Sequence, residues 1–242
     1  MPELSPMRGE IGIVYDAAFL YLSVRGVVAE RWGHGSGFGH HSIGHDNLIL
    51  MNKGGSRLAQ VNLKNSLFVE SSPALDWNKF VTDASGFLAD CLKTLQPAAV
   101  TAVYADVRLN SGVRTFSSAR DMIATALLGG RYGHSPSAQA VFDDLSVSLQ
   151  FKQGLTTITT TLGPMRRGEL GPQLQGEQDL ERFPDNLLFV QRRLDIYAGS
   201  NREKDRFTWE KAQERLESLI DSYVAKAPAD VSEYVDTILG QK

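Results

Sequence analysis

The feature of the sequence that most constrains the fold is an apolar stripe near its middle. Between Trp77 and Leu95, apolar side chains recur at intervals of three and four residues, which is the spacing of one face of an α-helix. Asp76 is placed to cap the first turn of this helix, and Pro97 lies just beyond its end. Because Cys91 falls on the apolar stripe, we interpret it as a core residue and not as a nucleophile.

After this helix, the apolar period changes to two. Apolar and polar side chains alternate from Val103 to Leu109, which predicts a half-buried strand. Comparable runs predict further strands at 47–52, 57–63, 66–70, 145–151, 155–162 and 188–196. Residues 17–28 are also interpreted as β-structure, with a helix as the alternative, because the periodicity of a short apolar run does not decide between them.

Helices are predicted in both halves of the chain, and they follow groups of strands. After the helix at 77–95, a short helix is expected at about 118–127, a long amphipathic helix from Phe207 to Val224, and a short one at 231–239. Residues 163–184 are predicted to form a long excursion. The order predicts an α+β protein of two halves, 1–133 and 138–242, each an antiparallel sheet followed by a long amphipathic helix, packed as one compact unit.

Several of these segments also carry a resemblance to a known family. They are the strand pair Arg57–Phe68, the helix start Asp76–Phe80, the strand Ala102–Asn110 and the element Arg193–Tyr197. Their order resembles a sporadically distributed prokaryotic family of roughly this length, whose members carry no established function. The resemblance covers 57–224, with Arg108, Leu194 and Asp195 as matching positions. It implies a two-part α+β architecture and supplies no activity.

The composition excludes several classes of protein. Apolar residues make up 42% and charged residues 22% of the 242 residues, a mixture that can bury a core. The net charge of -3 provides no general field for phosphates or anionic lipid. A single cysteine excludes an intramolecular disulfide framework. Residues 1–10 lack the apolar core of a signal peptide, and no apolar run could cross a bilayer, so a cytoplasmic location without membrane contact is expected.

The sequence lacks the common signatures of catalysis, such as a phosphate-binding loop, a G-x-S-x-G elbow or an H-E-x-x-H helix. Most of its histidines nevertheless cluster beside a carboxylate, at His34, His40, His41, His45 and Asp46. Imidazole and carboxylate are ligands that zinc, nickel and ferrous iron accept. This stretch is therefore the candidate metal site, and a divalent transition metal is the one cofactor that the sequence suggests. The glycines among these residues favour a solvated loop instead, and a catalytic histidine is a further alternative.

Two other clusters have a functional and a structural interpretation. Asp143 and Asp144 with Asp106 and Asp195 could gather around a divalent cation, but the polar face of half-buried strands is the preferred interpretation. Arginines of the second half could contact nucleic acid, with Trp32 and Tyr132 stacking on its bases; they are Arg166, Arg167, Arg182, Arg192 and Arg193. Because acidic residues lie among them, a solvated charged surface is preferred.

These observations lead to a non-catalytic binding or interaction protein of unknown ligand as the first functional hypothesis. Two long glycine-rich excursions, where recognition surfaces usually lie, support it. We expect a protein partner or a homo-oligomer and no membrane contact. A metal-dependent hydrolase or oxygenase that uses 34–46 is the second hypothesis, and nucleic-acid binding through the arginines is the third.

Overall fold

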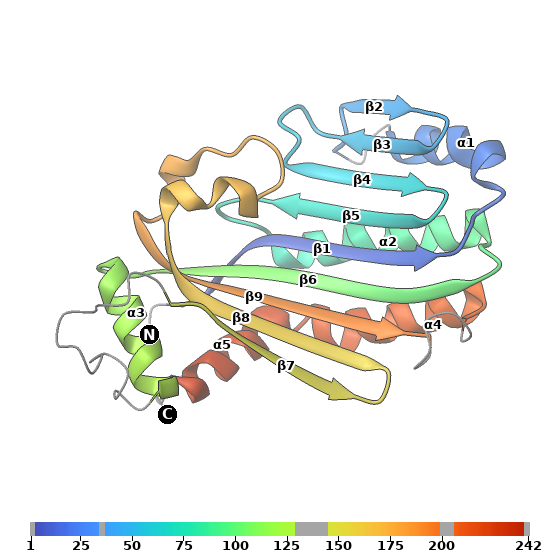
Figure 1. The fold of residues 1–242 in the computed structure, drawn as a ribbon. Helices are drawn as coiled ribbons and strands as arrows, with labels where there is room; N and C mark the ends of the chain where they lie inside the picture. The colour runs from blue at the N-terminus through green and yellow to red at the C-terminus, as the bar shows by residue number, and fades with distance from the viewer. Residues whose placement is uncertain (1–2, 34–36, 129–144, 199–205, 240–242) are drawn as a thin grey trace.

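The computed structural model of the protein describes residues 3–33, 37–128, 145–198 and 206–239. Within these residues, nine strands form one antiparallel sheet in the order β2-β3-β4-β5-β1-β6-β9-β8-β7 (Figure 1). The strands are β1 (Ser5–Tyr15), β2 (His40–Ile43), β3 (Asn47–Met51), β4 (Arg57–Asn62), β5 (Asn65–Ser71), β6 (Val100–Gly112), β7 (Val147–Gln153), β8 (Thr156–Arg166) and β9 (Asn186–Tyr197).

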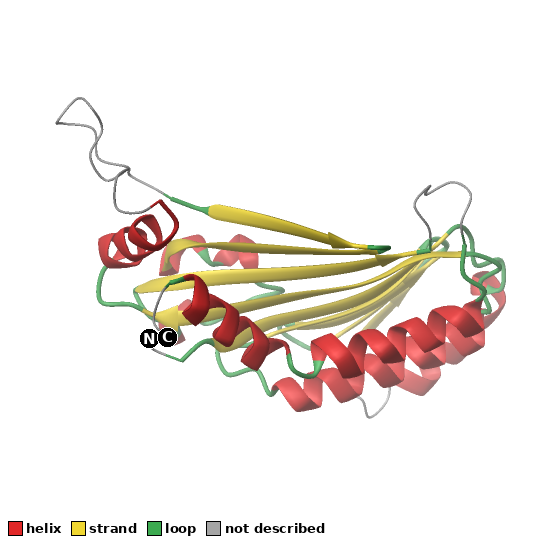
Figure 2. Cartoon of the chain, turned by 90° about the horizontal axis from the view of Figure 1, so that it is seen from below, coloured by secondary structure: helices red, strands yellow, loops and turns green. Residues whose placement is uncertain are grey.

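The long helices lie together on one side of the sheet (Figure 2). The α-helices are α1 (Tyr21–Gly33), α2 (Trp77–Leu95), α3 (Phe116–Leu128), α4 (Trp209–Leu219) and α5 (Ala227–Ile238), and a π-helical turn, Ile220–Val224, joins the last two. We call this side the helix-covered face. The opposite side, the open face, is covered in part by the segment 167–185. That segment contains the 3₁₀ turns Arg167–Glu169, Gly171–Gln173 and Leu180–Arg182.

Helix α2 is the main contact between the helix layer and the sheet. The Asp76 carboxylate accepts a hydrogen bond from the Lys79 backbone amide at 3.1 Å and caps the first turn, as the sequence predicts. The apolar stripe of α2 is buried and includes Cys91. The Trp77 indole donates to the Val224 carbonyl at 2.8 Å, so the start of α2 is bound to the π-helical turn. The sequence interpretation of this segment is confirmed in its caps and in its buried face.

Two apolar clusters lie on opposite faces of the sheet. The larger cluster fills the space between the sheet and the helices, where Phe68 lies 6.0 Å from Phe80 and 5.9 Å from Phe87 between ring centroids. The smaller cluster lies under the segment 167–185 and consists of Met7, Leu170, Leu174, Phe183, Leu187 and Phe189. This small cluster fixes the segment on the open face, so the predicted excursion at 163–184 is an anchored cover and not a free loop.

The α+β class is confirmed, while the division into two halves is not. Strand β6 of the predicted first half pairs along its length with β9 of the second half, so one sheet runs through both. The predicted boundary at 133–138 lies outside the described residues. Residues 17–28 are mostly helical, so the helix alternative holds there. Strand β1, which the sequence analysis did not identify, occupies the centre of the sheet.

Two glycines of β1 make room for aromatic rings on the two faces of the sheet. A Cβ at Gly9 would lie 2.4 Å from the Phe80 ring on the helix-covered face. A Cβ at Gly12 would lie 2.5 Å from the Tyr104 ring on the open face. Side chains at positions 9 and 12 of a strand point to opposite faces. Because these two positions carry no side chain, both rings can pack directly against the backbone of β1.

We predict that Gly9→Ala destabilises the protein by about 1–3 kcal/mol, because Phe80 is fully buried and overpacking forces neighbouring groups to move. Gly26→Ala is the matched control, since its Cβ meets nothing within 4 Å and alanine favours a helix by about 0.5–1 kcal/mol. The free energy of unfolding in urea measures both. Equal stability of the Gly9→Ala variant and the wild type would contradict the close approach of Phe80.

Candidate binding surfaces

The residues predicted to bind a metal lie around β2, at one edge of the sheet. His40 and His41 are adjacent in β2 and both exposed, and adjacent strand side chains point to opposite faces. His45 and Asp46 follow the strand, with the His45 Nδ1 atom 2.7 Å from Asp46 Oδ1. His34 lies outside the described residues. In the described part of the chain, no three His, Cys, Asp or Glu side chains are placed to hold a metal ion.

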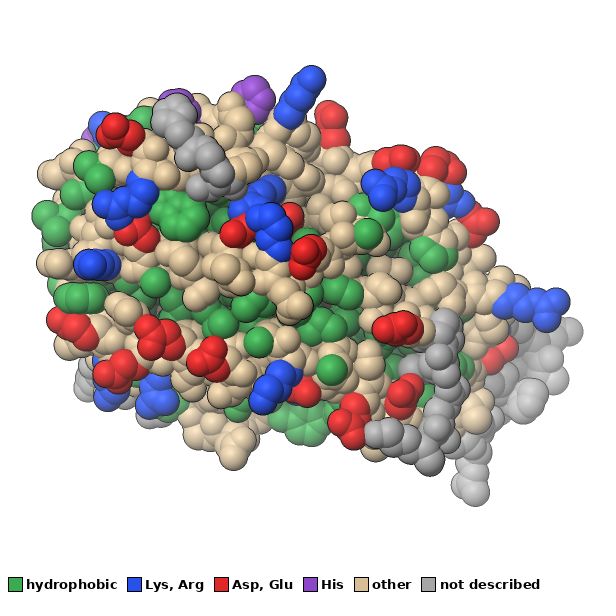
Figure 3. Space-filling view, turned by 180° about the vertical axis from the view of Figure 1, so that it is seen from behind, with side chains coloured by type: hydrophobic (Ala, Val, Ile, Leu, Met, Phe, Trp, Pro, Cys, Tyr) green, Lys and Arg blue, Asp and Glu red, His purple; other side chains and the backbone are tan. Residues whose placement is uncertain are grey.

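The metal hypothesis therefore stays a prediction without a supporting geometry. The structure also differs from the preferred loop interpretation, because His40–Ile43 is a strand paired with β3. Phe38 is buried, and its ring lies 5.8 Å from the Phe68 ring. In the sequence, Phe38 is an aromatic side chain among glycines, and this pattern could have indicated that the segment is packed against the core. In Figure 3, histidine side chains lie at the upper edge of the molecule, away from its centre.

Arg57 of β4 fastens this edge of the sheet to α2. Its guanidinium donates to Asp83 of α2 at 2.6 Å and to Glu70 of β5 at 3.3 Å. It also lies over the Phe38 and Phe68 rings, at 5.2 and 5.0 Å from their centroids. Desolvation raises the pKa of Glu70, although Arg57 opposes that shift. Both carboxylates are thus occupied by a structural ion pair at this edge.

A row of charged side chains crosses the centre of the open face. The register of β1, β6 and β9 places Glu10 beside Asp106 and Asp106 beside Arg193. The neighbouring positions place Arg8 beside Arg108, and Tyr104 beside Asp195. Residues at directly opposed positions of paired strands project to the same face. Side chains from three strands that are far apart in the sequence therefore form one polar network.

Each carboxylate of this network is held by an arginine. Glu10 accepts from Arg8 at 2.7 Å, and Asp106 accepts from Arg108 at 3.2 Å. The third pair is Asp195 with Arg193, whose Nη2 and Nε atoms donate at 2.9 and 3.1 Å. Three positive and three negative groups cancel. The network thus has no net charge with which to attract an ionic ligand.

Tyr104 connects two of these pairs. Its hydroxyl donates to Glu10 at 3.0 Å, and the Arg193 guanidinium lies 4.6 Å from the centre of its ring. Burial raises the pKa of Tyr104, and the neighbouring Glu10 charge raises it further. Tyr104 therefore stays protonated at neutral pH and serves as a hydrogen-bond donor. It does not have the lowered pKa that a general base or a nucleophile would need.

The network also holds the segment 167–185 on the open face. The Gln173 carbonyl accepts hydrogen bonds from Arg108 at 2.6 Å and from Arg8 at 3.3 Å. The Ser71 hydroxyl accepts from the Gln175 backbone amide at 2.9 Å. Charged donors make the stronger hydrogen bonds in proteins. The arginines therefore serve the packing of the protein's own chain.

The other two predicted clusters are used in a similar way. Asp106 and Asp195 lie on one sheet face, but each is paired with its own arginine, and Asp143 and Asp144 lie outside the described residues. Arg166 pairs with Glu169, and Arg167 pairs with Glu181 and Asp185. The Trp32 indole donates to Asp90 at 2.9 Å. Nucleic-acid binding stays a prediction, and these ion pairs give it no support.

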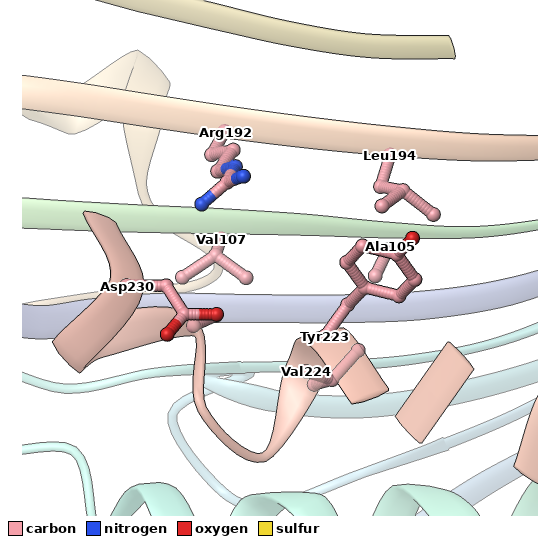
Figure 4. Close-up of a pocket in the computed structure, with 8 residues that line it drawn as sticks. Ala105, Val107, Arg192, Leu194, Tyr223, Val224 and Asp230 are labelled. Atoms are coloured by element: carbon pink, nitrogen blue, oxygen red, sulfur yellow. The ribbon is translucent and has the colours of Figure 1, made fainter. Parts of the chain in front are cut away.

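A small crevice opens where the π-helical turn meets the sheet (Figure 4). Its walls come from β6, β9, the turn and α5, with Arg192 and Asp230 at one end and Tyr223 at the other. Its volume is about 20 Å³, which holds about one water molecule. A π-helical bulge often marks a functional position, but this crevice is too small for a metabolite.

A larger hollow of about 400 Å³ lies at the ends of β3, β4 and β5. Its walls are mostly carboxamides, with Asp46 and Lys64 as the charged members. The Asn62 carboxamide donates to Asn65 and accepts from the Lys64 backbone amide, both at 2.7 Å. These bonds build the turn between β4 and β5. Some of the polar groups that line the hollow therefore have a structural role, because they stabilise this turn.

An exposed apolar surface surrounds α1. Phe19 is 83% exposed, Leu22 46% and Val27 47%, and Leu20 and Ile43 are exposed to a similar degree. Phe19 and Leu20 directly precede α1, Leu22 and Val27 lie within it, and Ile43 lies on β2, which packs beside α1. We call these five residues the α1 surface. The other side of α1 is buried through Tyr21, Val28 and Ala29.

The charged groups near the α1 surface are largely occupied. Arg25 donates to the Gly44 carbonyl at 3.0 Å and to the His45 carbonyl at 3.3 Å. Arg31 forms an ion pair with Asp90 of α2. A helix that binds an anionic membrane normally presents free lysines and arginines beside its apolar face. The two arginines of α1 instead bind groups of the protein itself.

Acidic and basic side chains are interspersed across the helix-covered face, with apolar side chains between them (Figure 3). Among the described residues, no helix has the length and apolar character needed to cross a membrane. The comparisons with known proteins found no protein-family model that matches this chain and no similar curated protein. The family resemblance therefore stays a prediction, and the functional argument rests on the surfaces of this chain.

We predict that Asp106→Ala lowers the free energy of unfolding by about 3–5 kcal/mol, the cost of removing one partner of a buried ion pair. Asp106 is buried, and its loss removes the carboxylate that accepts hydrogen bonds from Arg108 and Gln191. The matched control is Thr157→Ala on the same face, which should cost less than about 1 kcal/mol. Denaturation in urea measures both variants. An Asp106→Ala variant as stable as this control would show that the network is not structural.

Proposed function

We propose that the protein is a non-catalytic interaction protein that binds another protein through the α1 surface. The observation that carries the proposal is the exposure of Phe19 and Leu20 just before α1 and of Leu22 and Val27 within it, with Ile43 exposed on the neighbouring strand β2. Large apolar side chains that are exposed near one another on a folded protein are characteristic of an interaction site. Phe19 belongs to the aromatic residues that are enriched in protein interfaces.

The contacts of the polar groups support the same proposal. The carboxylates of the open face are each paired with arginine, and Tyr104 is held protonated by its surroundings. Cys91 is buried, and burial raises the pKa of its thiol, so it does not form a thiolate at neutral pH. These groups are thus paired or buried, whereas the exposure of the α1 surface has no such structural explanation among the described residues.

The experiment compares capture of a partner by three forms of the purified protein from an extract of the native host. We expect the wild type to enrich a protein that Phe19→Ser combined with Leu22→Ser enriches at least about tenfold less, because about 1.4 kcal/mol of lost binding energy gives that factor. Leu155→Ser, an exposed apolar residue of the β7–β8 turn, is the matched control and should capture normally. Because the substituted side chains are exposed, the variants should fold normally.

Two treatments separate the proposal from the alternatives. A nuclease should leave capture unchanged, and so should a chelator. Loss of the partner after nuclease treatment would indicate nucleic-acid binding, and loss after chelation would indicate a metal site. Equal capture by the double variant and the control would show that the α1 surface does not bind the partner.

A further inference from the structure

Within the part of the chain that the structure describes, strand β7 ends the sheet with a long edge that lacks the usual protection. It has seven residues, contains no proline, and pairs with β8 in continuous register from Val147 to Gln153. Lys152 is its one charged residue. Natural edge strands are normally short or interrupted by charges, prolines or bulges, because free backbone groups recruit other strands. At the other end of the sheet, β2 meets this rule, since it has four residues.

The side chains of β7 form two distinct rows. Val147, Leu149 and Phe151 pair with Leu162, Thr160 and Ile158 of β8 and lie toward the helix-covered face. Ser148, Gln150 and Lys152 lie toward the open face. Phe151 remains 52% exposed although its ring lies 6.3 Å from that of Tyr234 in α5. An apolar row thus continues to the outermost strand of the sheet.

We propose that β7 pairs antiparallel with β7 of a second copy of this chain, across a two-fold axis that passes beside Leu149. In this register Leu149 faces the partner's Leu149, and Phe151 faces the partner's Val147. On the open face, Ser148 faces the partner's Gln150. From residue 147 to residue 151, apolar residues then meet apolar residues and polar residues meet polar ones. Such cross-strand pairs are the units that stabilise a sheet.

Other registers are less complementary. A shift by one residue places the apolar row opposite the polar row. An axis beside Phe151 leaves Leu149 opposite the partner's Gln153 and brings the two Lys152 side chains to about 7 Å along the strands. With the axis beside Leu149, the two lysines are about 20 Å apart, beyond the screening length of about 8 Å at physiological salt. The separation of the two lysines and the pairing of apolar residues therefore both favour the axis beside Leu149.

This pairing joins two nine-stranded sheets into one continuous sheet with the long helices α2 and α4 of both copies on the same side. The α1 surface of each copy lies near β2, at the far end of its sheet, and stays accessible. The dimer therefore does not depend on the proposed function of that surface. Because one strand per copy forms the centre of the contact, we expect a small interface with a dissociation constant on the order of 1 μM.

A directed disulfide tests the axis. Directly opposed residues of antiparallel strands have Cα atoms about 4.5–5.5 Å apart, within the range that a disulfide needs. Since Cys91 is buried, a cysteine introduced in β7 is the exposed thiol of the chain. Under mild oxidation we expect Leu149→Cys to form a covalent dimer. The matched control is Lys152→Cys, whose two copies lie too far apart and should stay largely uncrosslinked.

Charge substitution provides a second test that does not rely on oxidation. Leu149→Glu and Leu149→Lys should each be monomeric in sedimentation equilibrium at protein concentrations where the wild type is dimeric, because like charges then meet at the axis. An equimolar mixture of the two should restore the dimer, which shows that each variant is folded. The Phe19→Ser, Leu22→Ser variant should dimerise normally.

Three results would overturn the proposal: a wild type that stays monomeric at 100-fold above the expected constant, equal crosslinking of the two cysteine variants, or a mixture of charge variants that stays monomeric. None of these outcomes bears on capture of a partner by the α1 surface. Failure of the dimer and failure of the proposed function are therefore distinguishable.

Discussion

The position of β1 at the centre of the sheet is the constraint on which the rest of the structure depends. This strand pairs with β5 on one edge and with β6 on the other, so it joins two groups of strands that lie on either side of it. The strand has no side chain at Gly9 and Gly12, where Phe80 and Tyr104 pack against its backbone from opposite faces. The apolar core therefore packs against one face of β1, and the charged network lies on its other face.

Local patterns predicted much of the secondary structure. The helix at 77–95 and the strands at 47–52, 57–63 and 66–70 agree closely with α2, β3, β4 and β5, because each has one buried face and one exposed face. Strand β1 shows this pattern only weakly, since Gly9 and Gly12 interrupt the alternation of apolar and polar side chains. Its place is fixed by pairing with partners distant in the sequence. The same long-range pairing of β6 with β9 could not be derived from local periodicity.

The α1 surface also could not be predicted from the sequence. The apolar residues of α1 occur on the buried side and on the exposed side, so the segment has no clear period. A sequence in which both sides are apolar does not reveal which side faces solvent. The histidine cluster presented the opposite case, because proximity along the chain suggested a shared site. The alternation of β2 directs His40 and His41 to opposite faces.

The open-face network illustrates the difference between a polar site and a reactive one. Asp106 and Asp195 were interpreted as the polar face of half-buried strands, whereas Glu10 lies in the strand that the sequence did not reveal. The partners of these residues depend on the register of three strands and on Gln173 from the covering segment. Buried ion pairs contribute little net stability compared with apolar packing. The contacts between strands do, however, specify the register, because a slip of two residues would separate Tyr104 from Glu10 and Gln191 from Asp106. We therefore assign the charges to specifying the fold.

What remains after these structural roles is concentrated at the two ends of the sheet. One end presents apolar side chains around α1, and the other presents the backbone edge and apolar row of β7. Both features favour association with another surface and neither provides a reactive group. If two copies join through β7, their α1 surfaces lie at the two far ends of one sheet. A dimer could then hold two partner molecules, or two sites of one partner, with an avidity that exceeds the affinity of a single α1 surface.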